Sequence, residues 1–300
     1  MKRWLLTLFV LLGVVPNPAP NAHCAELTEV KQDELGMYAQ DPESYQKLMA
    51  IGAVTVVQKG EKAFFVYWIP KGFEKREEKR ILVVLHGSRG NAYRHLMNFY
   101  KTARKHKFGL VSLQWGWPAE EGSTDQTQKQ KYDYLNPEAT YQAVSLAIKY
   151  LAKRYHIDSH GCALQCFSKA SKQSALFAFY DKKTGNNHFR LFMAVSSEVP
   201  QNDPAMKDLL SGAQGKTPIK DCHFYLWASQ QERNHAAAMQ HTKKMLESIG
   251  GVVEKLVIGP EKHSGFNHNL LYQEEAVQLW LKNSGAAGAN NRAKNPEEAP

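Results

Sequence analysis

Short, continuously apolar runs that alternate with longer amphipathic stretches constrain the fold of this chain more than any other sequence feature. A strand without polar alternation has both faces buried, which is typical of parallel strands covered by helices. The runs are ILVVLHG (81–87), GLVSLQW (109–115), CALQCFS (162–168), LFMAVSS (191–197), CHFYLWAS (222–229) and VEKLVIG (253–259). The helical patterns between and after them cover 92–106, 137–154, 170–181, 234–249 and 270–282. We therefore predict an α/β fold: a mostly parallel, doubly wound sheet with helices on both faces.

Flanking segments set the expected domain boundaries. The β-branched and aromatic runs 53–58 and 63–70 predict a hairpin at an antiparallel edge of the sheet. Residues 26–52 are expected to form an N-terminal arm or helix, 53–283 the main domain, and the Gly/Ala/Asn-rich residues 284–300 a disordered tail. Two long insertions follow strands, at 115–137 and 198–221. Folds of this kind carry substrate walls or lids in such insertions, so we expect the same here.

The N-terminus has the order of a secretory signal peptide. Lys2 and Arg3 precede an apolar run and a Pro-rich stretch with small residues, so residues 1–25 are interpreted as a cleaved signal. The run is shorter than the roughly 20 residues that a transmembrane helix needs, so stable membrane insertion after cleavage is not expected. We expect a secreted or periplasmic protein. Cys24 leaves a lipid anchor as the less favoured alternative.

Cysteines and charge suggest neither a metal site nor a nucleic-acid partner. The mature chain keeps Cys162, Cys166 and Cys222, an odd number, so at least one thiol is free. We interpret the first two as small core residues. No zinc-binding spacing is present among the cysteines and the 12 histidines. The net charge of +9 comes from scattered rather than striped basic residues, which disfavours nucleic-acid binding.

Ser168 is the candidate nucleophile. It ends a predicted buried strand and precedes a predicted helix, a corner at which a serine oxygen stands exposed above the sheet. The neighbours at such a corner must be small, and Cys166 and Ala170 are small. The string therefore resembles the nucleophile-elbow pattern G-x-S-x-G, with Cys and Ala in place of the two glycines. A serine at a strand end can also have a purely structural role as a helix cap.

The turn HGSRGNA (86–92), directly after the strand 81–85, is the candidate oxyanion hole. Two backbone N–H groups are needed to hold the oxyanion of a tetrahedral intermediate. We expect one from Ser88, or alternatively Arg89, and the other from Lys169, the residue after the candidate nucleophile. An ordinary tight turn without a ligand is the structural alternative.

The candidate base and acid follow later strands. His263 lies in the loop after the strand 253–259 and is favoured over His268, because a glycine soon after it lets the loop curl. A carboxylate is wanted after the strand 222–229 to orient the imidazole, and Glu232 lies there. Asp221 and Asp203 stay open as alternatives.

These motifs together resemble the α/β-hydrolase superfamily, especially secreted esterases similar to polyhydroxybutyrate depolymerases and feruloyl or acetyl-xylan esterases. The resemblance covers residues 53–283 and rests on HGSRGNA, CFSKAS and EKHSGFNHN, each at its expected place in the strand order. It implies an α/β-hydrolase fold, an acyl-enzyme mechanism, and no metal or organic cofactor. The chain departs from the family pattern at Cys166, Ala170 and Glu232, where glycines and an aspartate are usual.

Three functions remain open from the sequence. The favoured one is an exported hydrolase of small-molecule or polymeric carboxylic esters, in which Ser168 attacks, His263 acts as base and then acid, and Glu232 orients it. Trp115 and Trp117 are predicted to wall an acyl or aromatic pocket, with ordinary core packing of large aromatic residues as the equally favoured alternative. The alternatives are a peptidase or amidase with the same three residues, and a non-catalytic secreted binding protein on a hydrolase scaffold.

Overall fold

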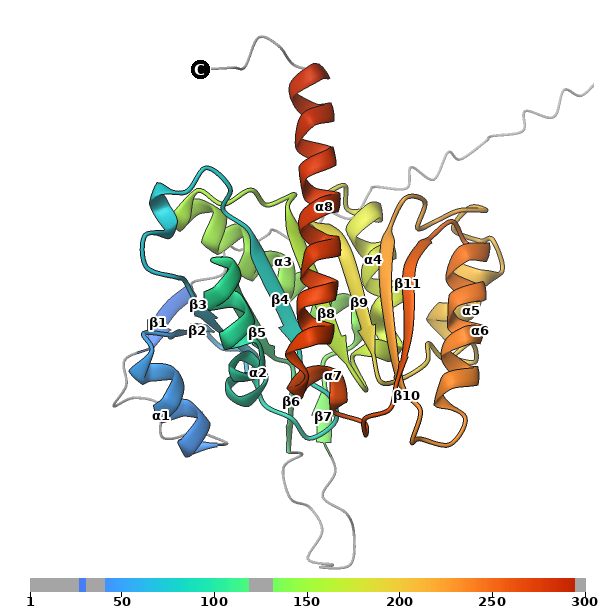
Figure 1. The fold of residues 1–300 in the computed structure, drawn as a ribbon, viewed down its shortest axis with the longest axis horizontal. Helices are drawn as coiled ribbons and strands as arrows, with labels where there is room; N and C mark the ends of the chain where they lie inside the picture. The colour runs from blue at the N-terminus through green and yellow to red at the C-terminus, as the bar shows by residue number, and fades with distance from the viewer. Residues whose placement is uncertain (1–26, 31–40, 119–131, 295–300) are drawn as a thin grey trace, which may run out of the picture.

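A nine-stranded sheet forms the centre of the computed structural model, which describes residues 27–30, 41–118 and 132–294. The strand order is β1-β2-β3-β5-β4-β8-β9-β10-β11 (Figure 1). Neighbouring strands from β5 to β11 in this order are parallel, whereas β1, β2 and β3 pair antiparallel at one edge. The strands are β1 (Leu27–Val30), β2 (Val54–Gln58), β3 (Phe64–Trp68), β4 (Ile81–Leu85), β5 (Gly109–Gln114), β8 (Cys162–Phe167), β9 (Phe189–Val195), β10 (His223–Ser229) and β11 (Val252–Gly259).

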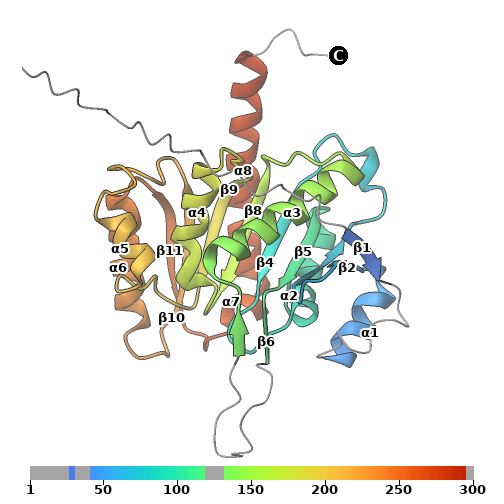
Figure 2. The ribbon, with the colours of Figure 1, turned by 180° about the vertical axis from the view of Figure 1, so that it is seen from behind.

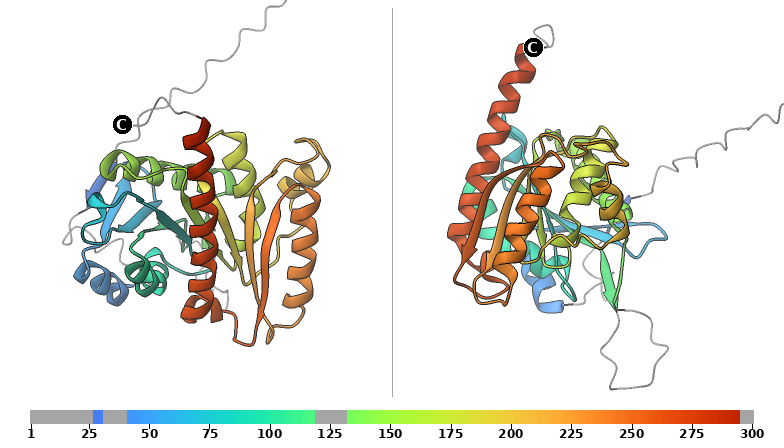
Figure 3. Two further views of the ribbon diagram at one scale, coloured as in Figure 1. Left: turned by 45° about the horizontal axis from the view of Figure 1, so that its top comes forward. Right: turned by 90° about the vertical axis from the view of Figure 1, so that its right-hand side faces the viewer.

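Helices cover both faces of this sheet (Figures 1 and 2). One core packs α1 (Pro42–Ala50), α2 (Ala92–His106) and α8 (Leu270–Lys294) against the sheet. A second core, on the other face, contains residues of α3 (Pro137–Tyr155), α4 (Ser174–Lys183), α5 (Pro204–Leu210) and α6 (His235–Ser248). Figure 3 shows α8 and α4 on opposite sides of the sheet. The predicted doubly wound α/β architecture is confirmed.

Strand burial explains why the sequence pattern was informative. All five residues of β4 and all six of β5 are buried, as continuous apolar runs predict for strands with a helix on each face. All eight predicted strands are present, and the predicted hairpin forms the antiparallel edge.

The helix starts follow local capping chemistry. The side chain of Asn91 accepts a hydrogen bond from the backbone N–H of Arg94 at the start of α2. Asn136 caps α3 in the same way, and Pro137 occupies the first turn. These caps place the start of α2 at the carboxyl end of β4, beside the predicted oxyanion turn.

Several elements differ from the sequence expectation. The arm contributes α1, as expected, and also the edge strand β1, which pairs with β2. The insertion after β5 contains a small hairpin of β6 (Gly116–Pro118) and β7 (Tyr132–Tyr134), and the other contains α5, capped by Asp203.

The final helix is longer than predicted. α8 continues past Ser284 to Lys294, so this part of the expected tail is helical; the stretch has no proline before residue 296 to stop it. The predicted signal 1–25, residues 119–131 of the first insertion and residues 295–300 of the tail lie outside the described residues. In the part that is described, no helix is long and apolar enough to cross a membrane.

Candidate active site

Ser168 lies at a strained corner directly after β8. Its φ of +52° is in the left-handed region, which non-glycine residues rarely adopt. The corner is held by a hydrogen bond of 2.8 Å from its backbone N–H to the carbonyl of Val195. Cys166 and Ala170 on either side are completely buried, so the tight packing that usually demands glycine is met here by two other small residues.

Three side chains from distant parts of the chain meet at this corner. His263 Nε2 lies 2.9 Å from Ser168 Oγ, and His263 Nδ1 lies 2.9 Å from Glu232 Oε2. A carboxylate can only accept, so Nδ1 carries the proton and the lone pair of Nε2 faces the serine hydroxyl. The structure therefore brings together the predicted serine, histidine and acid in a continuous hydrogen-bonded chain.

The loop that carries His263 is anchored at its backbone. Ser196, whose φ is +62°, donates its hydroxyl to the carbonyl of His263 at 2.6 Å. Ser229 likewise donates to the carbonyl of Glu261 at 2.5 Å. These two serines end neighbouring strands of the sheet, and no sequence motif singles them out. They fix the height of the imidazole above the sheet.

The sequence alternatives lie elsewhere. His268 is exposed at the end of the short helix α7 (Gly265–His268). Asp203 accepts hydrogen bonds from the first backbone N–H groups of α5. Asp221 is exposed in a turn before β10. Among the described residues, the hydrogen-bond network therefore selects His263 and Glu232.

The predicted oxyanion turn lies against Ser168. A Cβ added to Gly87 would come within 2.8 Å of Ser168 Cβ, so only glycine allows this approach. The Arg89 N–H is already used, because it donates to Tyr134 Oη at 3.0 Å. The N–H groups of Ser88 and Lys169 have no hydrogen-bond partner in the described part of the chain, which leaves them available for an oxyanion.

We expect Gly87→Ala to lower kcat/KM for an ester by about 10²–10³, the usual effect of losing one oxyanion donor. The added methyl group would push the turn away from Ser168. Ser88→Ala is the matched control: it keeps the backbone N–H and removes only an exposed hydroxyl, so its kcat/KM should stay within about threefold. A fully active Gly87→Ala enzyme would exclude this turn from the site.

Trp115 supports the turn from below. It has no exposed surface, and its indole N–H donates to the carbonyl of His86 at 3.1 Å. This corrects the expectation that Trp115 walls a substrate pocket: a completely buried indole cannot touch a substrate. Trp117, in β6, is partly exposed, and its role as a pocket wall stays a prediction. Tyr134 also lies beside the site, with Lys169 Nζ 4.4 Å from its ring centre.

Two buried histidines that the sequence did not single out lie beneath the site. Burial lowers the pKa of His86 to about 4 and that of His95 to about 3. His86 donates Nδ1–H to the carbonyl of Gly87 at 2.8 Å, and His95 Nε2 lies 2.8 Å from Gln165 Oε1. Both imidazoles are therefore neutral at neutral pH and act as structural hydrogen-bonding groups.

The free energy of unfolding should fall as the pH is lowered from 7 to 5. In this window the unfolded chain protonates these histidines, whose ordinary pKa is near 6.5, while the folded protein keeps them neutral. The expected loss is on the order of 2 kcal/mol per histidine. Urea denaturation at the two pH values measures this loss. The control is His241→Ala, at an exposed position, which should lose the same free energy of unfolding between pH 7 and 5 as the wild type. Equal stability at both pH values would contradict the neutral assignment.

A further residue, His235, meets the acid from the other side. Its Nδ1 lies 2.9 Å from Glu232 Oε2, the oxygen that also faces His263. His235 opens α6, three residues after Glu232. A Glu-x-x-His spacing at a helix start is too common in sequences to have signalled this contact.

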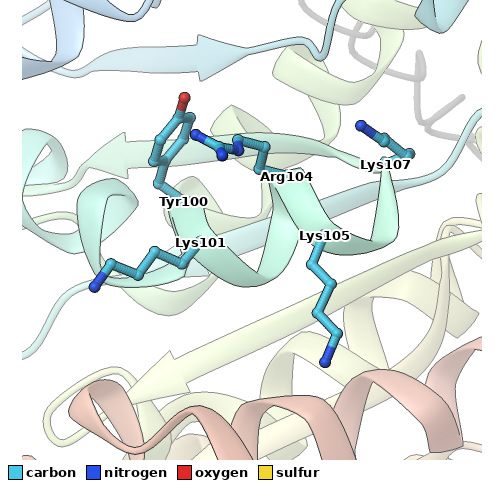
Figure 4. A pocket seen from close by; sticks show the side chains of 5 residues that line it. All are labelled: Tyr100, Lys101, Arg104, Lys105 and Lys107. Carbon is cyan, nitrogen blue, oxygen red and sulfur yellow. The ribbon is translucent and has the colours of Figure 1, made fainter.

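A basic hollow of about 510 Å³ lies on the C-terminal half of α2, lined by Tyr100, Lys101, Arg104, Lys105 and Lys107. This end of α2 is opposite to the one beside Ser168. Figure 4 shows that the side chains of Lys101 and Lys105 extend away from Arg104, and Lys105 pairs with Glu274. Its groups do not converge on a common point, so the hollow does not resemble a substrate site.

Comparison with known proteins shows the fold. No family model and no curated protein matches the chain. An esterase from Rhizomucor miehei aligns with a TM-score of 0.55 and 14% identity, covering 83% of this chain and 89% of that one. A thermophilic carboxylesterase cloned from a metagenomic library aligns with a TM-score of 0.51 and 12% identity, covering 85% of this chain and 97% of that one. For an α/β hydrolase from Vibrio vulnificus the TM-score is 0.50 and the identity 16%, and the alignment covers 79% of this chain and 84% of that one. The chain has the α/β-hydrolase fold.

Proposed function

We propose that this protein is an exported serine hydrolase that cleaves carboxylic ester bonds through an acyl-enzyme intermediate. The observation that carries the proposal is the hydrogen-bonded chain from Ser168 through His263 to Glu232, built on a serine with left-handed backbone. A serine needs no such backbone to cap a helix, whereas a nucleophile does to stand clear of the sheet.

The geometry supplies each step of acyl transfer. His263 Nε2 takes the proton as Ser168 Oγ attacks the ester carbonyl, and the charge on the imidazole is stabilised by Glu232. The carbonyl oxygen becomes an oxyanion beside the N–H groups of Ser88 and Lys169. The imidazole then gives its proton to the leaving alcohol, and water attacks the acyl-serine in the same manner to release the acid. None of these steps calls for a metal or organic cofactor.

The proposal of an ester substrate is supported by the similarity to solved structures of esterases and carboxylesterases. We extend the proposal to small or polymeric esters of the kind cleaved by secreted esterases similar to polyhydroxybutyrate depolymerases and feruloyl esterases. Export to the periplasm or the medium is proposed from the basic and apolar order of residues 1–25.

A matched substrate panel tests the ester preference. p-Nitrophenyl acyl esters and p-nitroanilides with the same acyl groups differ only at the bond that is cleaved. We expect kcat/KM for the esters to exceed that for the anilides by at least about 10³, because p-nitrophenolate leaves as a stable anion, whereas p-nitroaniline needs a proton from His263 to leave. Turnover of the anilides at a comparable rate would favour an amidase or peptidase instead.

A further inference from the structure

We propose that Glu232, His235 and His263 form a site for a divalent transition-metal ion such as Zn²⁺, and that the bound ion switches the hydrolase off. The inference rests on the proposed function, because it concerns the same acid and base. It concerns an inhibitory ion and not a catalytic one.

The three ligand atoms already lie close together. His235 Nδ1, Glu232 Oε2 and His263 Nδ1 lie within 4.8 Å of one another, and the carboxylate oxygen is 2.9 Å from each nitrogen. In a tetrahedral site with bonds of about 2.0–2.1 Å, neighbouring ligand atoms are about 3.3 Å apart. Side-chain shifts of a few tenths of an ångström to about 1.5 Å would therefore admit the ion.

The donor set selects the class of ion. Two imidazole nitrogens and one glutamate oxygen are a ligand set that Zn²⁺ accepts in enzymes, with a fourth position for water. Mg²⁺ and Ca²⁺ prefer oxygen ligands and would find only one carboxylate here. All three side chains are partly exposed, so the cluster lies close to the solvent, although His235 Nδ1 itself is buried.

His235 is the residue that an ordinary triad does not need. Its Nδ1 is buried and 2.9 Å from Glu232 Oε2, yet the direction of approach does not make a hydrogen bond, so this nitrogen has no hydrogen-bond partner among the described residues. The backbone fixes the pair, because the His235 N–H donates to the carbonyl of Glu232 at 3.2 Å. A buried nitrogen without a hydrogen-bond partner calls for an explanation, and beside a carboxylate a shared cation supplies one.

Metal binding and catalysis need the His263 imidazole in different tautomeric states. In the active form His263 carries its proton on Nδ1 and offers the Nε2 lone pair to Ser168. An ion bound at Nδ1 moves the proton of the neutral imidazole to Nε2, which can then no longer accept the proton of the serine hydroxyl. The ion also occupies the Glu232 oxygen that stabilises the imidazolium. Occupancy therefore removes the general base.

Binding is tested without substrate. The full mature chain, purified without a polyhistidine tag, is titrated with Co²⁺ and then Zn²⁺, and the visible absorption of bound Co²⁺ is followed. We expect one Co²⁺ per chain, displaced by Zn²⁺. His235→Ala should weaken binding by at least about 100-fold, since even the loss of an outer-shell partner costs 10–100-fold. The matched control, His241→Ala, changes an exposed histidine on the same helix and should bind like the wild type.

Inhibition is tested next, with each variant compared with its own metal-free rate. Zn²⁺ should inhibit ester hydrolysis by the wild type and His241→Ala alike, reversibly with EDTA, and should need at least about 100-fold higher concentration for His235→Ala. His263→Ala should also lose Co²⁺ binding, and Ser168→Ala should keep it, which covers the case of a misfolded His235 variant. Equal binding by wild type and both histidine variants would overturn the inference. Normal binding without any ester hydrolysis would instead contradict the proposed function alone.

Discussion

Replacing Ser168 with alanine should lower kcat/KM for a p-nitrophenyl ester by about 10⁴–10⁶ while the protein stays folded. In the proposed mechanism this hydroxyl is the attacking group, and no other hydroxyl in the described residues faces His263 Nε2 in the hydrogen-bond network. The loss of fold stability should be small, because within the described ranges the serine side chain makes a hydrogen bond only to His263, and Cβ is retained. Steady-state kinetics together with circular dichroism measure the two effects.

Ser248→Ala provides the control for this substitution. Ser248 is exposed near the end of α6 and donates only to the carbonyl of Met245, so its removal should leave kcat/KM within about twofold. A Ser168→Ala protein with wild-type turnover would mean that another group attacks the substrate.

Replacing His263 with alanine should cost almost as much as replacing Ser168. Without His263 Nε2 the serine proton has no acceptor. Glu232 also loses the imidazole that it orients next to Ser168. Residues that act as a unit are strongly non-additive, so the double variant with Ser168→Ala should be no slower than the worse single variant. Double-variant kinetics measure this coupling.

His268→Ala tests which of two histidines close in sequence acts as the proposed base. His268 is exposed and lies five residues after His263, so we expect less than about a threefold change in kcat/KM. A larger loss for His268→Ala than for His263→Ala would reverse the assignment of the base.

Continuous apolar runs made most of the fold predictable. β4 was predictable as a buried strand because both of its faces meet a helix layer and all five of its residues are apolar, whereas β8 has one polar residue, the buried Gln165. β1 was not predicted, because it is four residues long and has the polar residues Thr28 and Glu29 in its middle. Its place depends on tertiary contacts that a sequence does not display, such as the hydrogen bonds of Tyr67 and Tyr150 to Glu29 Oε1.

The site was predictable where chain order carries the information. In this fold the nucleophile, acid and base come in that chain order, each after a strand. Ser168, Glu232 and His263, which follow β8, β10 and β11, could therefore be placed without coordinates. Trp115 could not, because an aromatic residue after a strand is equally consistent with a pocket wall and with a core position. His235 was missed because its partner is set by the way α6 begins, with Asn234 in the left-handed region at φ +68°.

The most direct test of the serine-nucleophile assignment is labelling of the mature protein with a fluorophosphonate probe, followed by mass mapping of the modified peptide. Such probes react preferentially with a serine that a neighbouring base activates. We expect a single adduct on Ser168, absent from Ser168→Ala and strongly reduced in His263→Ala, with Ser248→Ala labelled like the wild type. A folded wild-type protein without an adduct, or with its adduct on another residue, would contradict the account.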